Sequence, residues 1–79
     1  MNMKLRVILF GQLCEIIGSS SLSLQGITDI KGLREALQKQ YPSLATMKYI
    51  IAVDKKIVEG NMPLDEKNTV ALLPPFSGG

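Results

Sequence analysis

Histidine is absent from this chain of 79 residues, and Cys14 is its only cysteine. The commonest general base and metal ligand is therefore missing, and a single thiol builds neither a metal site nor an internal disulfide. No glycine-rich phosphate loop follows an apolar strand-like run. These absences predict a chain that performs no catalysis alone and binds no metal or cofactor of its own.

The sequence also has little excess of positive over negative charge and no long apolar run. The formal net charge is +2, and the lysines and arginines are scattered along the sequence, so we expect no nucleic-acid partner. No apolar run approaches the roughly 20 residues that span a bilayer, so we expect a soluble protein with no membrane partner. One cysteine and no signal-peptide pattern predict a cytoplasmic location.

Aliphatic residues must supply the core of so small a chain. The hydrophobic fraction is 46%, which is ordinary for a globular protein and argues against disorder. The length predicts a single domain over residues 1–79, with residues 74–79 as a projecting tail.

Apolar periodicity predicts an α+β chain. Helical spacing marks a short helix over 12–17, with an apolar face that includes Ile16, and a longer helix between an Asp29 N-cap and Pro42. Gly32 weakens the longer helix and leaves room for close approach to the sheet. Alternation and β-branched residues mark strands, which fall at 3–10, 22–25, 49–53, 57–58 and 69–73.

One long helix can cover only one face of the predicted sheet. Ile8 and Phe10 alternate away from the core, and Ala71 or Leu73 would join them if the last strand lies beside the first. One interpretation is an apolar docking surface. The other is that the strand end bends and Phe10 covers the edge of the core.

The last seven residues, 73–79, read Leu-Pro-Pro-Phe-Ser-Gly-Gly. Pro74 and Pro75 forbid helix and remove two ladder donors, so the tail must leave the sheet extended. Gly78 and Gly79 lack Cβ atoms and can thread a narrow channel. A frayed terminus is the alternative, but the preceding prolines favour a projecting arm with a reactive carboxylate at Gly79.

Four parts of the sequence together resemble one family. They are the segment Phe10-Gly11-Gln12-Leu13-Cys14-Glu15-Ile16-Ile17-Gly18, the pieces Ala52-Val53-Asp54 and Met62-Pro63-Leu64, and the ending Val70-Ala71-Leu72-Leu73-Pro74-Pro75-Phe76-Ser77-Gly78-Gly79. Along essentially its whole length the chain resembles the small, sulfur-carrying subunit of molybdopterin synthase. The resemblance implies a β-grasp (ubiquitin-like) fold, a mixed sheet of about five strands packed on one main helix plus a short helix.

The resemblance also implies a function. An E1-like enzyme uses ATP to adenylate the carboxylate of Gly79, and a sulfur donor of the cysteine desulfurase or rhodanese type converts it to a thiocarboxylate. The large synthase subunit then receives the tail and transfers the sulfur to cyclic pyranopterin monophosphate, within a heterotetramer. The implied residues are Gly79 for the chemistry, Gly78 and Ser77 for tail passage, and Phe76, Pro75, Pro74, Leu73, Phe10 and Ile57 for partner binding.

Two positions depart from the family pattern. Cys14 stands where arginine is usual, so an ion pair is lost there. Its apolar neighbours and the absence of a nearby base favour a structural role over a sulfur relay. Asp54 replaces a common asparagine and still suits a tight turn.

Other functions fit the same tail. A thiamine-type sulfur carrier shares the chemistry but is usually shorter and lacks the helical segment 12–17. A protein modifier would join Gly79 to target lysines when an amine attacks the same acyl adenylate. A plain interaction module would leave the terminal glycines unexplained.

Overall fold

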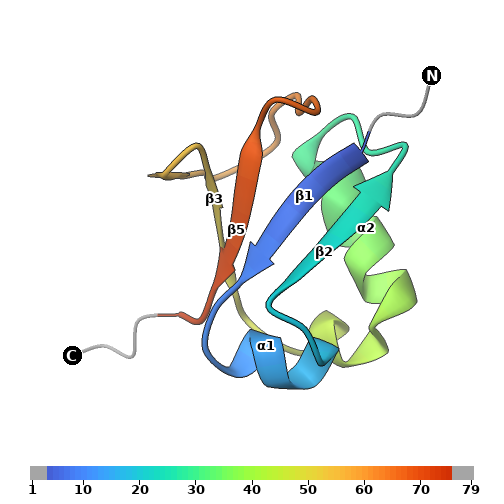
Figure 1. Ribbon diagram of the computed structural model, residues 1–79, viewed down its shortest axis with the longest axis vertical. Helices are drawn as coiled ribbons and strands as arrows, with labels where there is room; N and C mark the ends of the chain where they lie inside the picture. Colours follow the sequence, from blue (N-terminus) through green and yellow to red (C-terminus); the bar gives the residue numbers. More distant parts are fainter. Residues whose placement is uncertain (1–3, 76–79) are drawn as a thin grey trace.

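A mixed sheet of five strands lies against one long helix in the computed structural model, which describes residues 4–75 (Figure 1). The strands run in the spatial order β2-β1-β5-β3-β4. This is the β-grasp architecture that the family resemblance implies. The strands are β1 (Lys4–Leu9), β2 (Ser21–Gln25), β3 (Ile50–Val53), β4 (Lys56–Ile57) and β5 (Thr69–Leu73).

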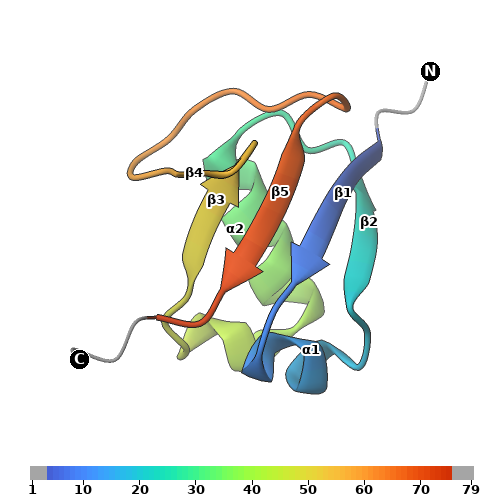
Figure 2. The same ribbon diagram turned by 60° about the vertical axis from the view of Figure 1, so that its left-hand side comes forward.

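The first and last strands are parallel neighbours in the middle of the sheet (Figure 2). Val7 pairs with Val70 and Leu9 with Leu72, whereas β2 pairs antiparallel with β1 and β3 pairs antiparallel with β5. Because β1 and β5 are parallel, both end at the same edge of the sheet. Phe10 and Pro74, the residues that follow these strands, therefore leave it side by side.

The short helix α1 (Gln12–Ile17) connects β1 to β2 and ends at Gly18, whose φ of 83° is left-handed. The long helix α2 (Ile30–Gln40) begins at Asp29, whose carboxylate accepts from the Gly32 N–H. Pro42 ends this helix and opens the 3-10 helix η1 (Pro42–Ala45). Within residues 4–75, no helix has the length and apolarity needed to cross a membrane.

All four N–H groups of the first α2 turn have hydrogen-bond acceptors. Ile30 donates to the Met62 carbonyl and Lys31 to the Asn61 side chain, and Gly32 and Leu33 donate to Asp29. The N–H groups of Ile30, Lys31 and Gly32 have no carbonyl partner within the helix, whereas Leu33 makes the first i→i−4 hydrogen bond of the helix. The 60–68 connection thus caps α2 as well as returning the chain to β5.

Aliphatic side chains from the inner face of the sheet and from α2 make the core. Leu13, Leu33, Leu37 and Leu72 have no measurable exposure. No polar or charged residue is buried among the described residues. The buried core comprises Leu5, Val7, Leu9, Leu13, Leu24, Ile27, Ile30, Leu33, Leu37, Leu44, Ile51, Val53, Leu64, Val70 and Leu72.

Several details differ from the sequence prediction. The first strand ends at Leu9 rather than at Phe10, and Met3, its predicted first residue, lies outside the described residues. Ile16 is 37% exposed, since six residues of helix can bury only part of one face. The space at Gly32 faces Asp29 rather than the sheet: a Cβ there would lie 3.0 Å from the capping Oδ1. This glycine accommodates the helix cap.

Candidate functional site

The face of the sheet away from α2, called the outer face below, is mainly apolar toward the end where β1 and β5 finish. One row of paired residues crosses four strands from Ile8 through Ala71 and Ala52 to Ile57. Alternation puts these residues opposite the buried core positions of the same strands. A second row, nearer the strand ends, pairs Leu73 with Ile50.

Two of the largest side chains on the outer face are strongly exposed. Phe10 is 47% and Ile57 is 59% exposed. The Phe10 N–H donates to the Leu72 carbonyl at 3.1 Å, so the ladder between β1 and β5 continues one residue beyond β1. Phe10 therefore stays on the side of Ile8, next to Leu73, and does not close the core.

Pro74 packs directly on Gly11 where β5 ends. Gly11 has φ 60° and ψ −135°, a combination almost confined to glycine. A Cβ at Gly11 would lie 3.0 Å from the Pro74 Cγ. The proline ring thus occupies the space that a side chain would take, and the contact fixes the direction in which the chain leaves the sheet.

The predicted site residues divide into three groups. Phe10, Leu73 and Pro74 lie together at one edge, and Ile57 lies two strands across the same face from β5, about 10 Å away by strand spacing. Pro75 is exposed. The others, Phe76, Ser77, Gly78 and Gly79, lie outside the described residues.

The opposite end of β5 is held by Asp54, in the turn between β3 and β4. Its carboxylate accepts from the Thr69 N–H at 2.9 Å and from the Asn68 side chain at 2.8 Å. These two hydrogen bonds, the Thr69 bond first, hold the pKa of Asp54 below its ordinary value. Asp54 and Lys55 both have positive φ, as a tight hairpin turn requires.

Cys14 lies on α1 with its thiol half-buried. The thiol donates to the Leu9 carbonyl, and its side chain packs against the core. Within residues 4–75 there is no group of three or more histidine, cysteine, aspartate or glutamate side chains that could hold a metal. The thiol thus takes part in packing at the start of α1.

Three further residues contribute to this site and are not among the predicted ones, namely Gly11, Ile50 and Ala52. Ile50 and Ala52 alternate with the core residues Ile51 and Val53 along β3, but all four residues are apolar and Ala52 is itself buried, so the sequence does not mark the outward-facing pair. Nothing in the sequence indicates that Gly11 meets Pro74, because the two residues are far apart along the chain.

Comparison with solved structures gives the same fold at low identity. The small archaeal modifier protein 1 of Methanosarcina acetivorans matches with a TM-score of 0.78 and 23% identity over 100% of this chain and 99% of that one. A putative molybdopterin converting factor subunit 1 from Pyrococcus furiosus matches with a TM-score of 0.81 and 19% identity, covering 91% and 97%. These likenesses establish a ubiquitin-like β-grasp domain.

A third solved structure is more similar in sequence. It is a chain of the complex between subunits 1 and 2 of the molybdopterin-converting factor from Helicobacter pylori, with 28% identity, a TM-score of 0.72, and coverage of 98% of this chain and 100% of that one. The family model described as "ThiS family" matches residues 7–79. The chain belongs to the ThiS family of ubiquitin-like sulfur carriers.

Proposed function

We propose that this protein is the sulfur-carrying small subunit of a molybdopterin synthase. The observation that carries the proposal is the exposed apolar outer face, whose central strand β5 runs directly into the Pro74-Pro75 exit. A carrier needs both a surface that binds its enzymes and an arm aimed at their active sites. The similarity to the Helicobacter pylori chain, solved as a complex of two subunits, supports this pathway.

The chemistry requires one reactive group, the carboxylate of Gly79. Its oxygen attacks the α-phosphorus of ATP on an E1-like enzyme and releases pyrophosphate. The terminal persulfide sulfur of a cysteine desulfurase or rhodanese-type donor then attacks the acyl adenylate and AMP leaves, which gives an acyl disulfide. A second thiol, outside this chain, reduces that disulfide by bonding to the donor's cysteine sulfur and so releases the thiocarboxylate. The resulting thiocarboxylate is a nucleophile that needs no histidine or second cysteine from this chain.

The large synthase subunit would accept the loaded tail and direct its sulfur to cyclic pyranopterin monophosphate. Gly78 and Ser77 are small enough to pass a narrow channel, and Phe76 would anchor the arm in the partner. Pro74 and Pro75 restrict the arm before docking and so lower the entropy lost on binding.

Loading is tested by intact mass. The chain is incubated with an E1-like enzyme, ATP and a sulfur donor, and we expect exchange of one oxygen for sulfur on the C-terminal residue. Addition of the large subunit and cyclic pyranopterin monophosphate should then yield molybdopterin. Deletion of Gly79 should abolish both steps and leave the folded domain unchanged by circular dichroism. Sulfur transfer by the deleted chain would overturn the proposal.

Docking is tested on the outer face with a matched pair of substitutions. Ile57→Lys places a charge in the apolar row, whereas Ile16→Lys makes the same change on α1, away from that row. We expect Ile57→Lys to weaken binding of the large subunit at least tenfold, about 1.4 kcal/mol. Ile16→Lys should bind within about twofold of the unmodified protein, and equal affinities for the two variants would contradict docking through this face.

A second candidate is a ubiquitin-like modifier, favoured by the likeness to the modifier protein of Methanosarcina acetivorans. In that function a lysine amine replaces sulfur as the nucleophile on the acyl adenylate. A thiamine-type sulfur carrier would load sulfur but fail to restore molybdopterin formation. Adducts between Gly79 and lysines of other proteins, without thiocarboxylate, would favour the modifier.

A further inference from the structure

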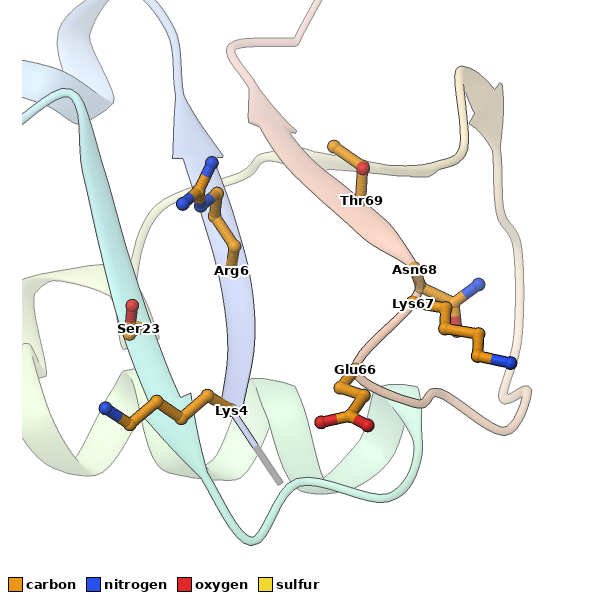
Figure 3. Close-up of a pocket in the computed structure, with 7 residues that line it drawn as sticks. All are labelled: Lys4, Arg6, Ser23, Glu66, Lys67, Asn68 and Thr69. Atoms are coloured by element: carbon orange, nitrogen blue, oxygen red, sulfur yellow. The ribbon is translucent and has the colours of Figure 1, made fainter. Parts of the chain in front are cut away.

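The outer face changes character toward the end where β1 begins. Arg6 lies on this face two residues before Ile8 of β1. It pairs with Ser23 of β2 on one side and with Thr69 of β5 on the other. Lys4 lies two residues before Arg6, on the same face of β1. Figure 3 shows these side chains bordering a hollow, with the 66–69 segment on its other side. We call this region the cationic hollow.

The cationic hollow contains the whole formal net charge of the protein. Lys4, Arg6 and Lys67 line it together with a single carboxylate, Glu66. The chain has nine lysines and arginines and seven aspartates and glutamates, so six charges of each sign remain elsewhere and cancel. The cationic hollow therefore has a net formal charge of +2, at the end of the outer face opposite Pro74.

The fold does not use these cations. Among residues 4–75, no hydrogen bond or ion pair joins the side chain of Lys4, Arg6 or Lys67 to another residue. Lys4 and Arg6 are exposed and point away from the core. Their charge is therefore available to a partner.

The cationic hollow lies within reach of any protein seated on the apolar rows. Arg6 is four residues from Phe10 on one strand, which is about 13 Å at the rise of a strand. A standard interface covers about 800 Å² on each partner, a patch roughly 30 Å across. A partner centred on Ala71 would therefore cover Arg6 as well.

We propose that the cationic hollow binds acidic side chains of the same protein that covers the apolar outer face. This inference rests on the proposed function, in which that protein is the large synthase subunit. Opposite charges steer association and fix orientation more than they add affinity. With carboxylates over Arg6, the partner is oriented along β5 so that its active site faces the tail end of the sheet.

The test compares two variants with the same change in charge. Lys4→Gln/Arg6→Gln removes two charges from the cationic hollow, and Lys31→Gln/Lys39→Gln removes two exposed charges from α2. Stopped-flow association with the large subunit is measured from about 50 to about 300 mM NaCl. We expect the hollow variant to associate roughly fivefold or more slowly at low salt and to have a shallower salt dependence. The α2 variant should stay within about twofold.

A charge exchange identifies the chemistry of the partner. Arg6→Glu should associate still more slowly, and lysine replacement of one acidic residue of the large subunit should restore the rate. Equal rates and salt dependences for the hollow and α2 variants, with normal sulfur transfer, would overturn this inference and leave the proposed function standing. Failure of the unmodified chain to bind the large subunit would overturn both. A third outcome would also overturn the inference. If no lysine replacement in the large subunit restores the association rate of Arg6→Glu, and the unmodified chain binds inorganic phosphate, the hollow is a site for a small anion instead.

Discussion

The ring of Pro74 rests on the backbone of Gly11, so close that a Cβ at Gly11 would lie 3.0 Å from the Pro74 Cγ. Gly11 begins the turn into α1, and Pro74 is the first residue after β5. This contact joins the end of the first strand to the start of the tail. It gives the tail a fixed point of departure that two prolines alone would not provide.

Substitution of Gly11 should therefore affect the tail as well as the fold. Gly11→Val introduces backbone strain of about 1–3 kcal/mol at a positive φ and pushes against Pro74. Gly26→Val is the matched control, because Gly26 also has positive φ but a Cβ there meets nothing within 4 Å. Urea denaturation should register a loss of stability in both variants. We expect slower thiocarboxylate formation by Gly11→Val alone, and equal rates in the folded variants would contradict a role for the contact.

Two adjacent leucines of β5 should separate folding from binding. Leu72 is fully buried in the core, whereas Leu73 is half-buried on the outer face. Leu72→Ala should lower the free energy of unfolding by about 2–5 kcal/mol, as expected for a core cavity. Leu73→Ala should cost about 1 kcal/mol or less and instead weaken binding of the large subunit. Chemical denaturation and calorimetric titration measure the two effects, and the reverse pattern would show that the faces are assigned wrongly.

Acid should destabilise the protein partly through Asp54. Hydrogen bonds from Thr69 and Asn68 lower the pKa of Asp54 in the folded state below its ordinary 3.8. A lowered folded pKa means that the stabilisation is present above the unfolded pKa and disappears as pH falls through the folded one. Asp29 behaves in the same way, because the Gly32 N–H and then Asn61 lower its pKa.

The pH dependence can be assigned with one isosteric change. Asp54→Asn removes the ionisable group while leaving an oxygen to accept from Thr69. We expect its urea midpoint to fall less steeply than that of the unmodified protein below about pH 4, and the two curves to converge in strong acid. Glu35→Gln, on the exposed side of α2, is the control for loss of one negative charge. If the urea midpoint of Asp54→Asn falls with pH in parallel with that of the unmodified protein, the hydrogen bonds to the Asp54 carboxylate do not stabilise the fold.

Cys14 should be dispensable for sulfur chemistry. Its thiol donates to the Leu9 carbonyl and packs against the core. Cys14→Ala should therefore lower the free energy of unfolding by about 1 kcal/mol and leave the rate of thiocarboxylate formation unchanged. Mass spectrometry of the loaded chain measures this rate. A large loss of loading in a folded Cys14→Ala variant would mean that the thiol relays sulfur.

Local patterns in the sequence predict most of the fold. Gln12–Ile17 and Thr69–Leu73 have the predicted bounds, because a left-handed glycine ends the helix and a proline follows the strand. Asp29 caps α2 as its position before an apolar stripe predicts. These signals act within a few residues, so one sequence is enough to read them.

Long-range contacts are the part that local patterns do not predict. A Cβ at position 32 would meet only the capping carboxylate of Asp29, but the sequence pattern equally allowed contact with the sheet. The outward direction of Ile8 and Phe10 is visible in their alternation. These side chains form one surface with those of β5 because Ile8 pairs with Ala71. The sequence does not predict this pairing, because residues far apart in the chain produce no shared periodic pattern.

The position of β5 has a consequence for synthesis of the protein. This strand is among the last parts of the domain to leave the ribosome, yet it occupies the centre of the sheet between β1 and β3. The earlier strands β1 and β3 share no ladder until β5 arrives, and closing so long a loop is slow. A chain that stops before residue 69 thus has two separate pieces of sheet and no base for a tail. Under the proposed function, only a chain that includes β5 can offer its tail to an activating enzyme.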